Sequence, residues 1–139
     1  MEMNLDHDGA IKAYNTLNDD ERRSVKSALG KISTHLSEMR TKLIDKQKAY
    51  TLTDIISTTQ GFLGFLTTIE KTISVLKGAF EWFNEYIVKP FTTLFEGIFK
   101  SLKNNKQGAI VGLLDQFLYD MESVLITFLS FIFSIIGLK

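Results

Sequence analysis

The segment Ser123–Leu138, SVLITFLSFIFSIIGL, decides what kind of fold this chain can form. It has no charged residue, and eleven of its sixteen residues are Val, Leu, Ile or Phe. As a helix it would be roughly 24 Å long, slightly shorter than the hydrocarbon core of a bilayer, which is about 30 Å thick. Its Ser and Thr hydroxyls can bond to carbonyls of their own helix. The composition favours a helix at a membrane, and the alternative is a core helix buried on all sides.

The residues before this run continue the same pattern. Apolar residues recur at steps of three and four: Ile110, Leu114, Phe117, Met121, Val124, Phe128, Phe131 and Ile135. This spacing predicts a C-terminal helix over residues 108–139 that is apolar from residue 123 and packs one face on neighbouring helices. The opposite face, with Leu125, Leu129 and Phe133, is then expected to contact lipid or a second subunit.

A second helix is predicted to begin after Asn18. Asn18 and Glu21 have the spacing of a capping box, and acidic residues fill the first turn. A heptad-like series follows at Val25, Leu29, Ile32, Leu36, Met39 and Leu43. His35 lies beside this series and is interpreted as a boundary residue.

The longest periodic stretch runs from Leu52 to Ile87 and is interpreted as one unbroken helix, after a reversal or junction at Tyr50–Asp54. Gly61 and Gly64 are unfavourable inside a helix, so they suggest close approach of another backbone, or a bend. The alternative is that Gly61 ends a short helix at residue 60. Pro90, the only proline, predicts a kink or restart. Ser101–Ala109, SLKNNKQGA, predicts a reversal.

Together these signals predict an all-α fold, an elongated antiparallel helical bundle or hairpin of three to four heptad-patterned helices with a very hydrophobic C-terminal helix. The expected organisation is a polar N-terminal lead-in over residues 1–18, a helical bundle region over 19–107 with a kink at Pro90, and the C-terminal helix over 108–139.

Within the lead-in, NLDHDGAIKAYN has a partial resemblance to an EF-hand or dockerin-type calcium loop. Asn4, Asp6 and Asp8 would be the first side-chain ligands, with Gly9 at the sharp turn. The twelfth position is Asn15 rather than a bidentate carboxylate, and only three residues precede Asn4. An Asx-type turn that starts a helix is therefore the favoured interpretation, and no metal or cofactor is predicted.

Composition excludes several functions. Sixteen Lys and Arg balance sixteen Asp and Glu, so there is no basic surface for nucleic acid. No Cys is present, and no phosphate loop, nucleophile elbow or zinc-protease motif occurs. Glu81 and Glu85 are the best carboxylate pair, without the Glu-x-x-His motifs of di-metal bundles. We expect no enzymatic activity and no small-molecule substrate.

The sequence favours a non-catalytic, membrane-associated helical protein whose C-terminal helix anchors or inserts, as a pore-forming or lytic component or as a structural protein of a membrane-containing assembly. The alternative is a soluble helical interaction module that buries this helix in its own core or against a partner. The expected partner is a lipid bilayer, with a homo-oligomer or another helical protein also possible. The predicted membrane or partner contacts are Leu125, Leu129, Phe133, Phe128, Ile132, Ile136, Trp82 and Tyr86.

Overall fold

The computed structural model describes residues 5–45, 52–104 and 111–138, and these residues form helices joined by short turns, without a β-strand. The helices are α1 (His7–Asn15), α2 (Asp19–Asp45), α3 (Leu52–Ile73), α4 (Lys77–Phe83), the π-helix η1 (Asn84–Val88), α5 (Lys89–Asn104) and α6 (Val111–Ile136). The prediction of an all-α fold is confirmed.

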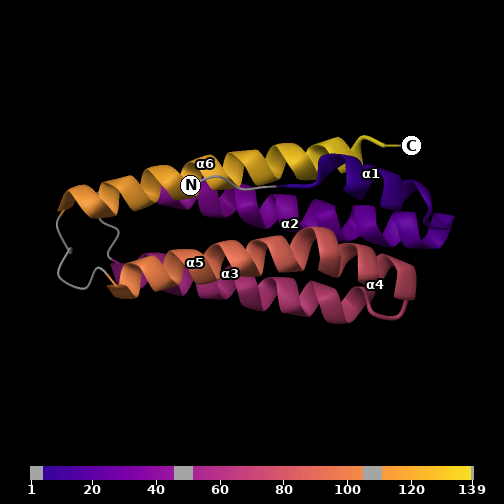
Figure 1. Cartoon of the computed structure of the whole chain (residues 1–139), viewed down its shortest axis with the longest axis horizontal. Coiled ribbons are helices and arrows are strands. Elements are labelled where there is room, and N and C mark those ends of the chain that lie inside the picture. Colours follow the sequence, from indigo (N-terminus) through magenta and orange to yellow (C-terminus); the bar gives the residue numbers. More distant parts are fainter. Residues whose placement is uncertain (1–4, 46–51, 105–110, 139) are drawn as a thin grey trace.

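The long helices α2, α3, α5 and α6 lie along a common axis (Figure 1). α2 and α6 run in opposite directions and share the most extensive helix–helix packing, while α3 runs back beside α2 and α5 runs back beside α3. The short helix α1 lies at the end of the molecule where α2 begins and α6 ends. Of the connection predicted at Tyr50–Asp54, residues 52–54 already belong to α3, and of that predicted at Ser101–Ala109, residues 101–104 still belong to α5. The rest of both segments lies outside the described residues.

The core forms from the apolar series that the sequence shows. In α2 all six residues of the series are buried: Val25, Leu29, Ile32, Leu36, Met39 and Leu43. In α3 the buried positions are Ile55, Thr59, Phe62, Leu66, Ile69 and Ile73. The polar member, Thr59, donates its hydroxyl hydrogen to the carbonyl of Ile55 over 2.7 Å, which satisfies the buried group.

The predicted start of the α2 helix is confirmed in atomic detail. The backbone N–H of Glu21 donates to Asn18 Oδ1 over 2.8 Å, and the backbone N–H of Asn18 donates to Glu21 Oε1 over 3.0 Å. These two reciprocal bonds are those of a capping box, and they satisfy two backbone donors at the helix end.

The unbroken helix predicted from Leu52 to Ile87 is wrong. α3 ends at Ile73, and a turn over residues 74–76 leads into α4, with Leu76 in an extended conformation. Thr72, Ile73, Ser74 and Val75 all have modest helix propensity, which makes this the weakest point of the stretch. The three-residue turn keeps the apolar spacing almost in phase, so periodicity alone could not reveal the break.

The kink predicted at Pro90 takes the form of a local π-helix. The backbone N–H of Lys89 bonds to the carbonyl of Asn84, five residues earlier, and α5 begins directly after η1. Proline lacks an N–H and its ring crowds the carbonyl four residues before it. The wider π-turn before Pro90 accommodates both effects, so the chain remains helical from Lys77 to Asn104.

The N-terminal lead-in is more structured than predicted. Residues 7–15 form α1, in which Ala10 and Tyr14 are fully buried. Asp6 caps this helix by accepting a 2.9 Å hydrogen bond from the backbone N–H of Gly9. The segment that resembles a calcium loop therefore forms a capped helix from His7 onward, as the Asx-type interpretation predicted, while Asn4 lies outside the described residues.

The two glycines expected at a close backbone contact have none within the described fold. Gly61 and Gly64 are both exposed, and a Cβ added at either would have open space around it. The close approach is instead at Gly78 in α4, where an added Cβ would collide with the carboxylate of Glu21 from the α2 capping box.

Candidate membrane-contact helix

The helix α6 packs a wide face on the rest of the bundle. Between Leu118 and Ile135 its buried residues are Leu118, Met121, Val124, Leu125, Phe128, Leu129, Phe131, Ile132 and Ile135. Phe128 meets Phe91 of α5 with 3.8 Å between ring centroids, which joins α6 to α5. One side of α6 is therefore an ordinary core face.

The other side of α6 is exposed and unusually apolar. Tyr119, Ile126 and Phe133 have 70%, 45% and 55% of their surface exposed. Between Leu118 and Ile136 the remaining exposed positions carry hydroxyl side chains: Ser123, Thr127, Ser130 and Ser134. No charge follows Glu122 on the described part of this helix. From Ser123 onward, the outward face thus has neither the lysines nor the glutamates that usually cover a surface helix.

Hydroxyl groups on this outward face bond back to the helix itself. Thr127 donates to the carbonyl of Ser123 over 2.9 Å, and Ser134 donates to the carbonyl of Phe131 over 2.7 Å. A side chain that is satisfied in this way carries no unpaired hydrogen-bond donor into an apolar environment.

By length and composition, the segment Leu118–Ile136 can cross a membrane. Its 19 residues would span about 28 Å as a helix, close to the thickness of the hydrocarbon core. It is 44% buried in the bundle, and core helices of proteins without a membrane pass the same test.

The predicted contact residues fall into two groups. Phe133 is exposed, and Ile136 is half-buried near the end of α6. Leu125, Phe128, Leu129 and Ile132 are buried against the bundle. Leu125 and Leu129 were expected on an outward face, but α6 packs on several helices at once and they belong to its core side. Ile126 also faces outward, although it was not among the predicted contacts. It lies seven residues before Phe133, and this spacing places both residues on the same face of a helix.

The two predicted contact residues outside α6 are not fully exposed, since Trp82 is buried and Tyr86 is half-buried. Trp82 is 3% exposed, and its ring lies 6.4 Å from Tyr14 and 5.4 Å from Tyr86, measured between centroids. Its indole Nε1 donates to the carbonyl of Ala10 over 2.9 Å. The cause is α1, which covers this part of α4. Burial, with smaller contributions from Asp6 and Glu85, raises the pKa of the half-buried Tyr86 hydroxyl above its ordinary value.

Polar and aromatic contacts hold α6 near its middle and around its C-terminal end. Arg40 of α2 and Glu122 form a partly exposed ion pair at 3.6 Å. Around the C-terminal end, Lys26 Nζ donates to the carbonyl of Leu138, and the His7 ring meets Phe131 edge-on at 4.8 Å. The sequence gives no local sign of these contacts, because the partners come from α1 and α2.

Within the described residues no cluster of three metal-ligating side chains occurs. In comparisons with known proteins, no protein family, curated protein or solved structure matches this chain. The α6 surface is therefore interpreted from its own chemistry.

Proposed function

We propose that this protein is a non-catalytic, membrane-associated helical protein that packs α6 against its own bundle in water and transfers it to a bilayer. The observation that carries the proposal is the outward face of α6, which exposes Ile126 and Phe133 and has no charge after Glu122.

The other long helices provide the contrast. The exposed surface of α2 carries Arg23, Lys31 and Glu38, and that of α5 carries Lys89, Glu96 and Lys100. Charged outer faces of this kind keep a helical bundle dissolved and monomeric. α6 differs from α2 and α5 in having its charges only in its first half. Transfer of its second half from water to lipid would therefore desolvate no charged side chain.

The energetics favour transfer once α6 leaves the bundle. Val, Leu, Ile and Phe each contribute about −0.3 to −0.6 kcal/mol when they insert at the centre of a bilayer helix. Eleven such residues lie between Ser123 and Leu138. Lipid chains would also replace the apolar contacts that Leu125, Phe128 and Ile132 make in the bundle. Anchoring, pore formation and a structural role in a membrane-containing assembly would each depend on this transfer of α6 from the bundle to the bilayer.

A second candidate is a helical interaction module that keeps α6 in its core. The complete burial of Leu125, Phe128, Ile132 and Ile135 favours it. In that case Ile126 and Phe133 would contact a protein partner or a second copy of the chain. α6 would then stay packed in the bundle when a bilayer is present.

A double variant of exposed residues tests the proposal without disturbing the core. Ile126→Lys with Phe133→Lys places charges on the outward face of α6, and Lys near the centre of a spanning helix costs about 2.5–3.5 kcal/mol. We expect the wild-type chain to float with phosphatidylcholine vesicles and to release an encapsulated dye, and the double variant to remain unbound.

The matched control is Val75→Lys, because Val75 is an apolar residue with 84% exposure in the turn between α3 and α4. This variant should float like the wild type. A wild-type protein that stays below the vesicles at saturating lipid, with circular dichroism showing a folded chain, would reject the membrane proposal and leave the interaction module.

A further inference from the structure

A pocket opens between α2 and α3, away from the surface of α6 discussed above. Its volume is about 350 Å³, within the usual range for a small-molecule site. His35, Met39 and Lys42 line it from α2, and Ser57, Thr58 and Gly61 line it from α3. Two helices thus contribute hydrogen-bonding side chains to one space.

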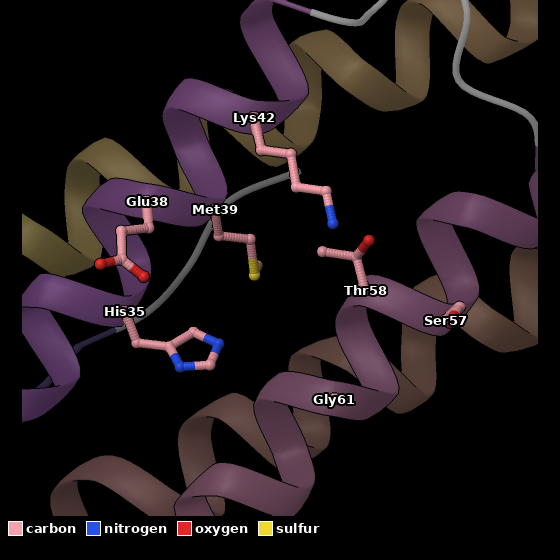
Figure 2. Close-up of a pocket in the computed structure, with 7 residues that line it drawn as sticks. All are labelled: His35, Glu38, Met39, Lys42, Ser57, Thr58 and Gly61. Atoms are coloured by element: carbon pink, nitrogen blue, oxygen red, sulfur yellow. The ribbon is translucent and has the colours of Figure 1, made fainter.

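Side chains from both helices point toward this space (Figure 2), although those of Glu38 and Ser57 are not seen to do so. Lys42 and Thr58 point toward one another across the gap, and His35 and Met39 point into it. Glu38 is also a lining residue, but its carboxylate points away from Lys42 and Thr58. Among the described lining residues, the ammonium group of Lys42 is therefore directed at the gap, and the carboxylate of Glu38 is not.

Contacts with α3 fix the orientation of the His35 ring. It stacks on Phe65 with 4.5 Å between centroids and meets Phe62 edge-on at 5.3 Å. A ring held on two sides loses little rotational freedom when it donates a hydrogen bond to a ligand.

Gly61 contributes part of the pocket wall from α3. Glycine is unfavourable in a helix interior, and this one is exposed with open space where a Cβ would lie. Nothing in the described fold uses that space. Glycine is common where a backbone must approach a ligand closely, and Gly61 forms a wall of the pocket.

We propose that this pocket binds a phosphate monoester. Lys42 would supply the positive charge, Ser57 and Thr58 hydroxyl donors, and His35 a ring N–H, while Gly61 leaves room for the phosphate oxygens. A tetrahedral anion with several acceptor oxygens matches donors that come from both sides of a gap, and charge-assisted hydrogen bonds are the strong ones. This site is independent of α6 and of its transfer to a membrane.

Phosphate monoesters occur as soluble metabolites and as the headgroup of phosphatidic acid, so the test has two arms. In the first, the full-length protein is titrated with glycerol 3-phosphate in a calorimeter. In the second, its binding to phosphatidylcholine vesicles is compared with and without phosphatidic acid. Binding through α6 contributes to both measurements, so the difference between them reports binding to the phosphatidic acid headgroup.

Two variants disable the pocket, and each has a matched control. Lys42→Gln removes the charge, and its control is Lys71→Gln at an exposed lysine of α3 outside the pocket. Gly61→Leu fills the space, and its control is Gly64→Leu, one turn further along α3 at a glycine with equally open surroundings. Leucine favours a helix more than glycine does, so both leucine variants should stay folded.

We expect saturable binding in at least one arm, weakened at least about tenfold by Lys42→Gln and by Gly61→Leu and unchanged by the two controls. The arm that responds identifies the soluble or lipid source. No binding in either arm, or binding that Lys42→Gln and Gly61→Leu leave intact, overturns the proposal.

Discussion

The indole Nε1 of Trp82 donates a hydrogen bond to the backbone carbonyl of Ala10 over 2.9 Å, although the two residues are 72 positions apart. Both residues are buried, and the bond joins α1 to α4. It explains why a segment with a polar sequence becomes part of the core.

Replacing Trp82 by Phe should loosen α1. The variant loses a buried hydrogen bond and part of a large side chain, which together cost about 1–3 kcal/mol. Chemical denaturation would measure this loss, and hydrogen exchange should rise first at residues 7–15. Unchanged exchange in α1 would contradict the role assigned to the bond.

Tyr14→Phe is expected to stabilise the protein or to leave its stability unchanged. The Tyr14 hydroxyl is buried and has no hydrogen-bond partner in the described part of the chain. An unpaired buried polar group costs about 1–3 kcal/mol, and phenylalanine keeps the ring contact with Trp82. A clear decrease in the thermal midpoint would show that the hydroxyl does have a partner in solution.

Replacing two phenylalanines of α6 by alanine should change the stability of the fold by very different amounts. Phe128 is fully buried, so Phe128→Ala is expected to cost about 3–5 kcal/mol in the free energy of unfolding. Phe133 is 55% exposed, and Phe133→Ala should change stability by only about 0.5 kcal/mol. Urea denaturation of both variants in the absence of lipid checks which face of α6 is the core face.

The glycines of α3 and α4 form another contrasting pair. Gly64→Ala gains helix propensity in open space, so we expect about 1 kcal/mol of stabilisation. Gly78→Ala gains the same propensity but displaces the Glu21 carboxylate from the α2 capping box, which costs about 1 kcal/mol. Thermal unfolding should therefore show a higher midpoint for Gly64→Ala than for Gly78→Ala.

Alkaline stability should depend on Tyr86. Its pKa is raised above 10.0 in the folded state, first by burial and then by Asp6 and Glu85. The folded protein therefore holds this proton to a higher pH than the unfolded chain does. Its contribution to stability is complete below the unfolded pKa and is lost as pH rises through the folded pKa.

Tyr86→Phe removes that contribution, so the variant should lose less stability than the wild type between about pH 9 and about pH 11. Thermal midpoints measured across this range would show the two curves diverging on the alkaline side. Parallel curves would mean that Tyr86 titrates alike in both states.

Much of the helical organisation could be predicted because the signals are local. The capping residues Asn18 and Glu21, the buried series of α2 and the apolar run of α6 each depend on side chains a few positions apart. The break after Ile73 was missed because a short turn preserves the spacing of apolar residues, and the π-helix was missed because Pro90 allows several backbone responses.

The candidate sites were less predictable for the same physical reason. Phe133 could be identified from the run itself, whereas the burial of Leu125, Leu129 and Trp82 depends on what covers them. The pocket formed by Lys42, Thr58 and Gly61 joins residues from two helices, and no spacing in the sequence indicates it.

By itself, the sequence determined that this protein is helical, where most of its apolar faces lie, and that its last helix lacks charge after Glu122. These properties follow from backbone periodicity and from the composition of single segments. The tertiary structure alone decided which side of α6 is covered, that α1 closes over Trp82, and that Gly61 borders a pocket. Those outcomes depend on packing between segments that are distant in the chain, and packing is set by the shapes of both partners.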